Sequence, residues 1–232
     1  AYSVDVLGTR NVLEACMAAG VRHLVVTSSG AAYGYYADNP QPLREDDAIR
    51  GNPEFAYSDH KRQIEAMLAE ARRAHPELKQ LILRPGTVIG PATRNQITDL
   101  FDKRFVLGLW ACDSPFVFIW DEDVAACIIK GVLDEAEGVY NLAGDGALSP
   151  REIAAIMGKP YVPLPVAPLR AVLWLLRAIG ATQYGPEQVN FLRYRPVLDN
   201  NRLKSEFAYT PRYTSREAFE HFLEARRTGS RP

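Results

Sequence analysis

The stretch His23-Leu24-Val25-Val26-Thr27-Ser28 is short and apolar, as is typical of a strand buried inside a parallel sheet. A long helical pattern follows at 53–74, and a second apolar run, Gln80-Leu81-Ile82-Leu83-Arg84, comes after it. A strand, a helix and a strand in this order predict two parallel strands joined by a right-handed crossover. The chain is therefore predicted to be an α/β protein with a doubly wound parallel sheet.

Elsewhere the pattern alternates further and then becomes mainly helical. Ser149-Pro150-Arg151-Glu152 has the spacing of a capping box with proline at the first helical position, and Thr214 and Glu217 repeat that spacing. Both places predict the start of a helix. The remaining predicted strands and helices lie at 4–19, 116–119, 121–133, 138–142, 168–179, 186–193 and 215–226.

We expect two parts in the chain. Residues 1–110 form the catalytic half of the sheet domain, and residues 111–232 add further sheet elements and a smaller, mostly helical substrate lobe. Within that lobe the segment 171–176 is strongly apolar. It predicts a helix buried in the core, and the alternative is a helix that forms the wall of an apolar pocket.

Composition excludes several classes of protein. The formal net charge of the 232 residues is −1, with Lys and Arg scattered along the chain, so no nucleic-acid partner is expected. Three widely spaced cysteines form neither a metal nor a disulfide pattern, which favours a reducing, cytoplasmic setting. The most apolar stretch, 167–180, contains two arginines and is shorter than the roughly 20 residues that span a bilayer. We expect no metal and no membrane span.

The chemistry is indicated by Tyr57-Ser58-Asp59-His60-Lys61 in the long helix. Residues four apart lie on one helix face, so the phenol of Tyr57 and the ammonium of Lys61 point the same way. A nearby cation favours the phenolate form, and the pair can then exchange a proton with an alcohol or a carbonyl oxygen. Taken alone, this spacing also fits a surface pair that has no function.

The neighbouring strands strengthen the functional interpretation. The first strand ends in Thr27-Ser28-Ser29, and the second is followed by Pro85-Gly86-Thr87. The carboxyl ends of parallel strands form the rim at which such sheets bind ligands. We therefore expect three features from successive parts of the chain to lie at one rim. They are the hydroxyl groups after the first strand, the Tyr57–Lys61 pair of the helix, and the Gly/Pro turn after the second strand.

Several segments together resemble a known family. The longest matches are Gly8-Thr9-Arg10-Asn11-Val12-Leu13-Glu14-Ala15, Ser28-Ser29 with Tyr33-Gly34, Tyr57 with Lys61, and Leu83-Arg84-Pro85-Gly86. Other matches lie at 116–125, 139–144 and 198–203. Over nearly its whole length the chain resembles the extended short-chain dehydrogenases, the NAD-dependent epimerase/dehydratase family. The resemblance implies a partial Rossmann-like sheet, NAD or NADP as cofactor, and a small-molecule substrate.

The same resemblance implies roles for individual residues. Ser29, Tyr57 and Lys61 would be catalytic, with Tyr57 as the acid/base. The residues implied to contact the cofactor are Ser28, Tyr57, Lys61, Pro85, Gly86 and Thr87. The residues implied to contact the substrate are Gly30, Ala31, Thr87, Arg193 and Arg195.

The chain departs from the family in three places. No glycine-rich dinucleotide loop occurs in it, so we expect that its N-terminal part is missing, and that a homodimer or a separate N-terminal segment completes it. Asp5 replaces the usual asparagine, and Phe116 replaces an arginine that clamps nucleotide diphosphates in relatives. The alternatives are a hydroxysteroid-like dehydrogenase for an apolar substrate and a non-catalytic remnant that has lost cofactor binding.

Overall fold

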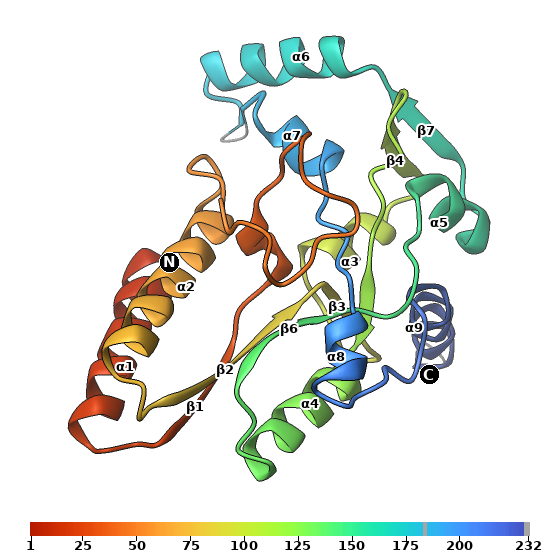
Figure 1. Cartoon of the computed structure of the whole chain (residues 1–232). Helices are drawn as coiled ribbons and strands as arrows, with labels where there is room; N and C mark the ends of the chain where they lie inside the picture. The colour runs from red at the N-terminus through yellow and green to blue at the C-terminus, as the bar shows by residue number, and fades with distance from the viewer. Residues whose placement is uncertain (183–184, 230–232) are drawn as a thin grey trace.

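The centre of the molecule is a parallel sheet of three strands in the order β1–β2–β6 (Figure 1). The computed structural model describes residues 1–182 and 185–229. Strands β1 (His23–Thr27), β2 (Lys79–Pro85) and β6 (Gly138–Leu142) pair in parallel, with Val25 opposite Leu81 and Leu83 opposite Tyr140. The predicted α/β class and the parallel pairing of the first two strands are confirmed.

Helices cover both faces of this sheet (Figure 1). A π-helical turn (Ser3–Leu7), α1 (Gly8–Ala18) and α2 (Ala56–Ala74) lie on one face, where Ile82 packs against Leu13 and Leu68. Helices α4 (Asp121–Leu133) and α8 (Asn201–Ser205) lie on the other face, against Leu81 and Leu83. Because successive side chains of a strand point to opposite faces, β2 is covered on both sides and carries the apolar run Leu81, Ile82 and Leu83 at its centre.

The central strand changes partner at Gly86. The backbone N–H of Gly86 donates to Leu142 O (2.9 Å), and the next N–H, of Thr87, donates to Val117 O (3.0 Å). Beyond this point β3 (Thr87–Ile89) pairs with β5 (Phe118–Trp120) instead of β6. A Cβ at position 86 would lie 2.8 Å from Val117 Cγ2, so the crossing of the strands requires glycine.

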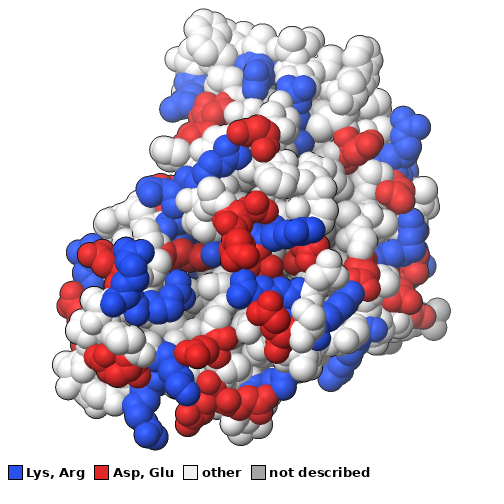
Figure 2. Space-filling view, in the orientation of Figure 1, with Lys and Arg blue, Asp and Glu red and all other residues white. Residues whose placement is uncertain are grey.

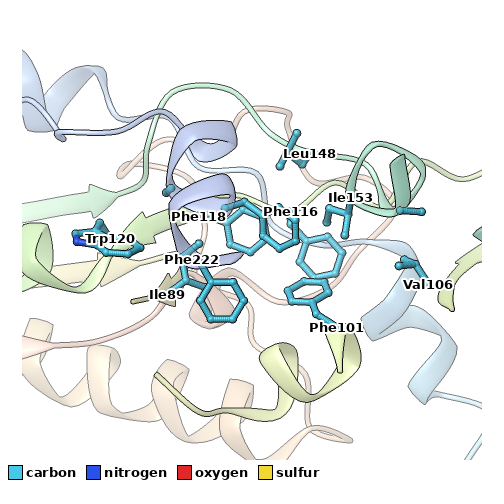
Figure 3. Packing of buried hydrophobic residues seen from close by; sticks show 12 residues of the cluster. Ile89, Phe101, Val106, Phe116, Phe118, Trp120, Leu148, Ile153 and Phe222 are labelled. Atoms are coloured by element: carbon cyan, nitrogen blue, oxygen red, sulfur yellow. The ribbon is translucent and has the colours of Figure 1, made fainter. Parts of the chain in front are cut away.

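The largest apolar cluster lies between the β3–β5 pair and α9 (Ser215–Gly229) (Figure 3). The rings of Phe116 and Phe118 stack at 5.8 Å between centroids, and Phe101, from α3 (Gln96–Phe101), packs on both. The cluster joins the sheet to the C-terminal lobe. The rest of that lobe consists of β4 (Val106–Leu109), β7 (Tyr161–Leu164), α5 (Pro150–Met157), α6 (Val166–Ala178) and α7 (Gln188–Arg193).

Both predicted helix starts are confirmed. Ser149 Oγ accepts from the N–H of Glu152, whose carboxylate accepts from the N–H of Ser149, and Thr214 and Glu217 repeat this arrangement. The helix 121–133 and the strand 138–142 have the bounds that the pattern predicts.

The prediction of a buried core helix at 171–176 is wrong. Helix α6 contains no buried residue. It lies at the edge of the lobe beside α7 (Figure 1), with half-buried leucines along one side and exposed apolar residues along the other. No helix in the described part of the chain combines the length and the hydropathy needed to cross a bilayer.

Candidate active site

The first strand delivers Ser29 to the carboxyl edge of the sheet. The N–H of Ser28 still donates to Leu83 O of β2 (2.7 Å), which extends the ladder past the end of β1. Ser29 then caps a 3-10 turn, Gly30–Tyr33, because its Oγ accepts from the N–H of Ala31 (3.1 Å). Ser29 is buried at the base of this turn.

Helix α2 brings Tyr57 and Lys61 to the same edge. Lys61 Nζ donates to Thr27 O (3.0 Å), and Ser58 Oγ donates to Ala31 O (2.7 Å), so two hydrogen bonds tie the start of α2 to the segment that holds Ser29. Lys61 Nζ lies 5.7 Å from the centroid of the Tyr57 ring. The expected side-by-side placement of phenol and ammonium is thus present, and the Tyr57 side chain is accessible, at 57% exposure.

The environment of Lys61 is partly apolar and partly anionic. Burial lowers the pKa of its ammonium, and the carboxylates of Asp5 and Glu65 oppose that shift. Of the three donors of an ammonium, one is used by Thr27 O. Within the described part of the chain, the other two donors of Lys61 have no hydrogen-bond acceptor.

Asp5 contacts α2 directly behind this pair. Its Oδ2 lies 2.7 Å from Nδ1 of the buried His60, and its backbone carbonyl accepts from Thr9 Oγ1 (2.6 Å). The π-helical turn that contains Asp5 is therefore fastened to α2 next to Lys61. This contact is the structural result of having aspartate at position 5 and histidine at position 60.

Ser28 belongs to a buried polar network below the site. Its Oγ donates to Glu65 Oε1 (2.5 Å), and Arg84 donates to both Glu65 oxygens at 2.6–3.0 Å. Arg84 also donates to the hydroxyl of Tyr33 (2.7 Å). Burial raises the pKa of this hydroxyl to about 12, although the nearby guanidinium acts in the opposite direction. The Ser28 hydroxyl is thus used within the protein, and the sequence pattern did not reveal Glu65, Arg84 or Tyr33 as its support.

The residues after β2 are held by the two sheets. Pro85 is buried at the end of β2. The N–H of Gly86 donates to Leu142 O, and the N–H of Thr87 donates to Val117 O. Gly30 packs against Leu198, whose Cδ1 would be 3.0 Å from an added Cβ. These residues form the floor between the β1 end and the β2 end.

Arg195 is the unusual group on the substrate side. It is 8% exposed, and its guanidinium lies between the rings of Phe116 (3.9 Å) and Phe191 (4.7 Å). Within residues 1–182 and 185–229 it forms neither a hydrogen bond nor an ion pair. Burial lowers its pKa to about 10, so it stays charged at neutral pH.

Tyr35 connects Arg195 with Tyr57. Burial raises the pKa of Tyr35 to about 12; the Arg195 cation opposes the shift and Tyr57 adds to it, so both groups are electrostatic neighbours of this ring. Tyr35 packs with Phe55 and Phe191 at centroid distances of 5.7 and 4.9 Å. An unpaired cation and the candidate acid/base therefore adjoin one aromatic cluster.

Arg193 has a different setting from Arg195. It is half-buried over the ring of Tyr194 (4.9 Å), and its carbonyl accepts from Cys112 Sγ (3.2 Å). Sequence alone did not distinguish the two arginines. In the structure they differ, because Arg195 is buried against Phe116 and Phe191, whereas Arg193 is half-buried over Tyr194.

An open cavity lies elsewhere, in the C-terminal lobe. It has a volume of about 490 Å³ and lies between the β4–β7 pair and the start of α5, where Arg151 covers the Tyr161 ring. None of the predicted site residues lines it. In the described residues, no group of His, Cys, Asp and Glu side chains is arranged to hold a metal ion.

Comparisons with known proteins agree with this geometry. Residues 1–113 match the model of the NAD dependent epimerase/dehydratase family. An uncharacterized protein of Mycobacterium tuberculosis is 26% identical over 224 residues, which cover 96% of this chain. The chain spans 60% of the length of that relative. The N-acetyl-alpha-D-glucosaminyl-diphospho-ditrans,octacis-undecaprenol 4-epimerase of Escherichia coli O157:H7 is 36% identical over 103 residues, 44% of this chain and 30% of that protein.

Solved structures share the arrangement of the whole chain. The dTDP-glucose 4,6-dehydratase of Bacillus anthracis, in complex with NAD, superposes with a TM-score of 0.73 at 15% identity, covering 99% of this chain and 69% of that one. MoeE5 in complex with UDP-glucose and NAD has a TM-score of 0.70 at 25% identity, covering 97% and 71%. Residues 1–113, just under half of the chain, are therefore similar to the NAD dependent epimerase/dehydratase family, and the fold of the chain is that of these NAD-bound structures.

Proposed function

We propose that the chain carries the catalytic residues of an NAD- or NADP-dependent oxidoreductase of the epimerase/dehydratase type. The observation that carries the proposal is the arrangement of Tyr57 and Lys61 on one face of α2, tied to the end of β1 beside Ser29. The solved relatives that are in complex with NAD support the choice of cofactor.

The chain's own residues would act on the reacting oxygen of a secondary alcohol or ketone. Tyr57 takes the hydroxyl proton during oxidation and returns it during reduction. The Lys61 charge stabilises the phenolate, and its two remaining donors bind ribose hydroxyls. Ser29 Oγ would hold the oxygen as its charge changes. A bound nicotinamide supplies the hydride acceptor.

Arg195 supports a substrate that carries an anionic group. The guanidinium has no hydrogen-bond partner among the described residues, and its nitrogens are not sealed from solvent, so a diphosphate or a carboxylate could reach it and form charge-assisted hydrogen bonds. A sugar linked to a diphosphate meets this requirement, and two relatives are described with such sugars in their names. The aromatic cluster around Tyr35 favours the second candidate, an apolar-substrate dehydrogenase, but that substrate would leave Arg195 unpaired.

The test is turnover and cofactor binding measured on the same variants. Tyr57→Phe should lower turnover by about 10²- to 10⁴-fold and leave the Kd for NAD nearly unchanged, since only the proton-transfer group is lost. Lys61→Met should weaken both, and Lys79→Met, at an exposed position of β2, serves as the control. Wild-type turnover in Tyr57→Phe would contradict the proposal. A chain that binds neither NAD nor NADP would favour the non-catalytic remnant.

Substrate class is tested separately by thermal shift. UDP-glucose should raise the Tm of the wild type, and Arg195→Met should abolish the shift. Stabilisation by steroids alone would favour the apolar-substrate dehydrogenase. A homodimer and a complementing N-terminal segment stay predictions, which sedimentation would test.

A further inference from the structure

Helix α6 exposes large apolar side chains to solvent. Val172, Trp174, Leu175 and, just after the helix, Ile179 are 52%, 62%, 54% and 67% exposed. Leu169, Leu173 and Leu176, spaced four and three residues apart, form a half-buried stripe along the helix. At 100° per residue the exposed side chains cover the opposite arc, which also contains Ala171 and Ala178. The helix is therefore apolar on the side that faces solvent as well as on the side that packs.

The charges of α6 border this arc. The helix contains two arginines and no acidic residue. Arg170 and Arg177 lie seven residues apart on one flank, where they donate to Asn190 Oδ1 (2.8 Å) and Glu187 Oε1 (2.8 Å). Figure 2 shows an uncharged surface along the α6 edge, with blue side chains directly below it. An apolar arc edged by cations is typical of a helix that lies in a membrane interface.

A second exposed tryptophan adjoins the start of the helix. Trp110 is 61% exposed, and its N–H donates to Leu164 O (3.0 Å), two residues before α6 begins. Tryptophan rings are enriched at the headgroup level of bilayers because one edge is polar and the rest apolar. Trp110 and Trp174 thus add two interfacial side chains to the arc.

The size of the arc favours a lipid surface over a second copy of the chain. A helix of 13 residues is about 20 Å long and about 10 Å wide, so it offers far less than the roughly 800 Å² per partner of a stable dimer. A bilayer needs no such minimum, and arginines beside the arc match anionic headgroups. We propose that α6, with Trp110, docks the protein on the surface of an anionic membrane, with the helix lying in the plane of the interface.

The docking surface is connected to the candidate site. The chain runs from α6 into α7, and Phe191 of α7 covers the guanidinium of Arg195. Docking would therefore bring the lipid surface close to the proposed anion-binding group, which suits a sugar diphosphate that is carried on a lipid. This consequence for the substrate rests on the proposed function, whereas the docking itself does not.

The test is cosedimentation of the 232-residue chain with vesicles. We expect binding to phosphatidylcholine vesicles that contain phosphatidylglycerol, and weaker binding to pure phosphatidylcholine. Trp174→Glu and Leu175→Glu should each lower the partition coefficient about tenfold or more, because a carboxylate enters the apolar arc. Ile129→Glu, at a 60% exposed position of α4, is the matched control and should change it less than about twofold. Tryptophan emission should shift to the blue on binding, and far-UV circular dichroism checks that the variants fold.

Three outcomes would overturn the proposal. The wild type could bind neither kind of vesicle, or Ile129→Glu could lose as much binding as Trp174→Glu. A concentration-dependent dimer that Trp174→Glu abolishes would show that a second copy covers the arc. Equal binding to both vesicle types, unchanged in Arg170→Gln with Arg177→Gln, would remove the anionic part of the proposal. Activity is not needed for any readout, so failure here leaves the proposed function intact.

Discussion

The ion pair of Arg84 and Glu65 holds together a strand, a helix and a loop below the candidate site. Both side chains are about 95% buried, and Arg84 also donates to the Tyr33 hydroxyl and to Glu45 O. Each nitrogen of the Arg84 guanidinium donates to at least one acceptor, and Ser28, next to Ser29, donates to Glu65, so the network helps to position the segment that carries Ser29. A buried ion pair adds little net stability when intact, but loss of one partner leaves an uncompensated charge.

We expect Arg84→Met to lower the free energy of unfolding by about 3–5 kcal/mol, because the Glu65 carboxylate would remain buried without its cation. Urea unfolding followed by circular dichroism measures the change. The control is Asp38→Asn, which removes an exposed partner of Arg50 and should leave the midpoint nearly unchanged. If Arg84→Met behaved like the control, the network would not be what supports the site.

Among the elements, the junction of β2 and β3 sets the geometry of the rim. Gly86 stands where one strand leaves β6 and joins β5, with no room for a side chain. The two sheets and the candidate site therefore share a single backbone segment. A glycine at such a junction is required by close approach. Gly8, at the start of α1, has helical φ and ψ, and an added Cβ would make only an ordinary contact there, 3.8 Å from Ser3 O.

The two glycines should respond to alanine with opposite signs. Gly86→Ala places a Cβ against Val117 and should lower the unfolding free energy by about 1–3 kcal/mol. Gly8→Ala should raise it by about 0.5–1 kcal/mol, since alanine favours the helix. Thermal and urea unfolding of both variants provide the measurement, and stabilisation by Gly86→Ala would contradict the packing described for the junction.

The long elements and the helix starts were predictable because their signals are local. Capping boxes and apolar runs depend only on neighbouring residues, as at Ser149 and in β2. The short strands β3, β4 and β7 and the helix α3 were missed. For α6 the helix was predicted correctly but its burial was not, because apolar composition does not say which surface a helix meets.

In the candidate site, too, some contacts were predictable from local spacing and others depend on the tertiary structure. Tyr57 and Lys61 are four residues apart, so spacing alone predicted that they would be neighbours. The contact between Tyr33 and Asn141 joins residues 108 positions apart, and no local pattern predicts it. The isolation of Arg195 is likewise a result of tertiary packing, in which two aromatic rings occupy the places of its possible partners.

At the scale of the whole molecule, the accessibility of the Cys127 thiol measures how often the core between α4 and the central sheet opens. The thiol is 1% exposed, and burial raises its pKa to about 12, with the Asp123 carboxylate acting in the same direction. Cys16 and Cys112 are only half-buried. A thiol-specific reagent therefore distinguishes surface access from opening of the core.

In a chain with Cys16→Ser and Cys112→Ser, we expect the single remaining thiol to react with Ellman's reagent at pH 8 only as fast as the core opens. At that pH the thiol lies below its pKa, so it is protonated as well as inaccessible. Urea should accelerate labelling in parallel with unfolding. Rapid labelling of the folded chain would show that α4 separates from the sheet far more readily than its packing indicates.

The change of partner at Gly86 also bears on how the chain is made. On the ribosome, β2 can pair with β1 once residue 85 has emerged, but Pro85 finds its other neighbour, Leu142, only 57 residues later (142 − 85). At ordinary rates of translation this interval lasts about 3–11 s. Throughout this interval β2 has one unpaired edge, and the candidate site lacks the neighbouring strand β6. During this interval the nascent chain exposes an unpaired strand edge that a chaperone can bind, while the candidate substrate site is still incomplete.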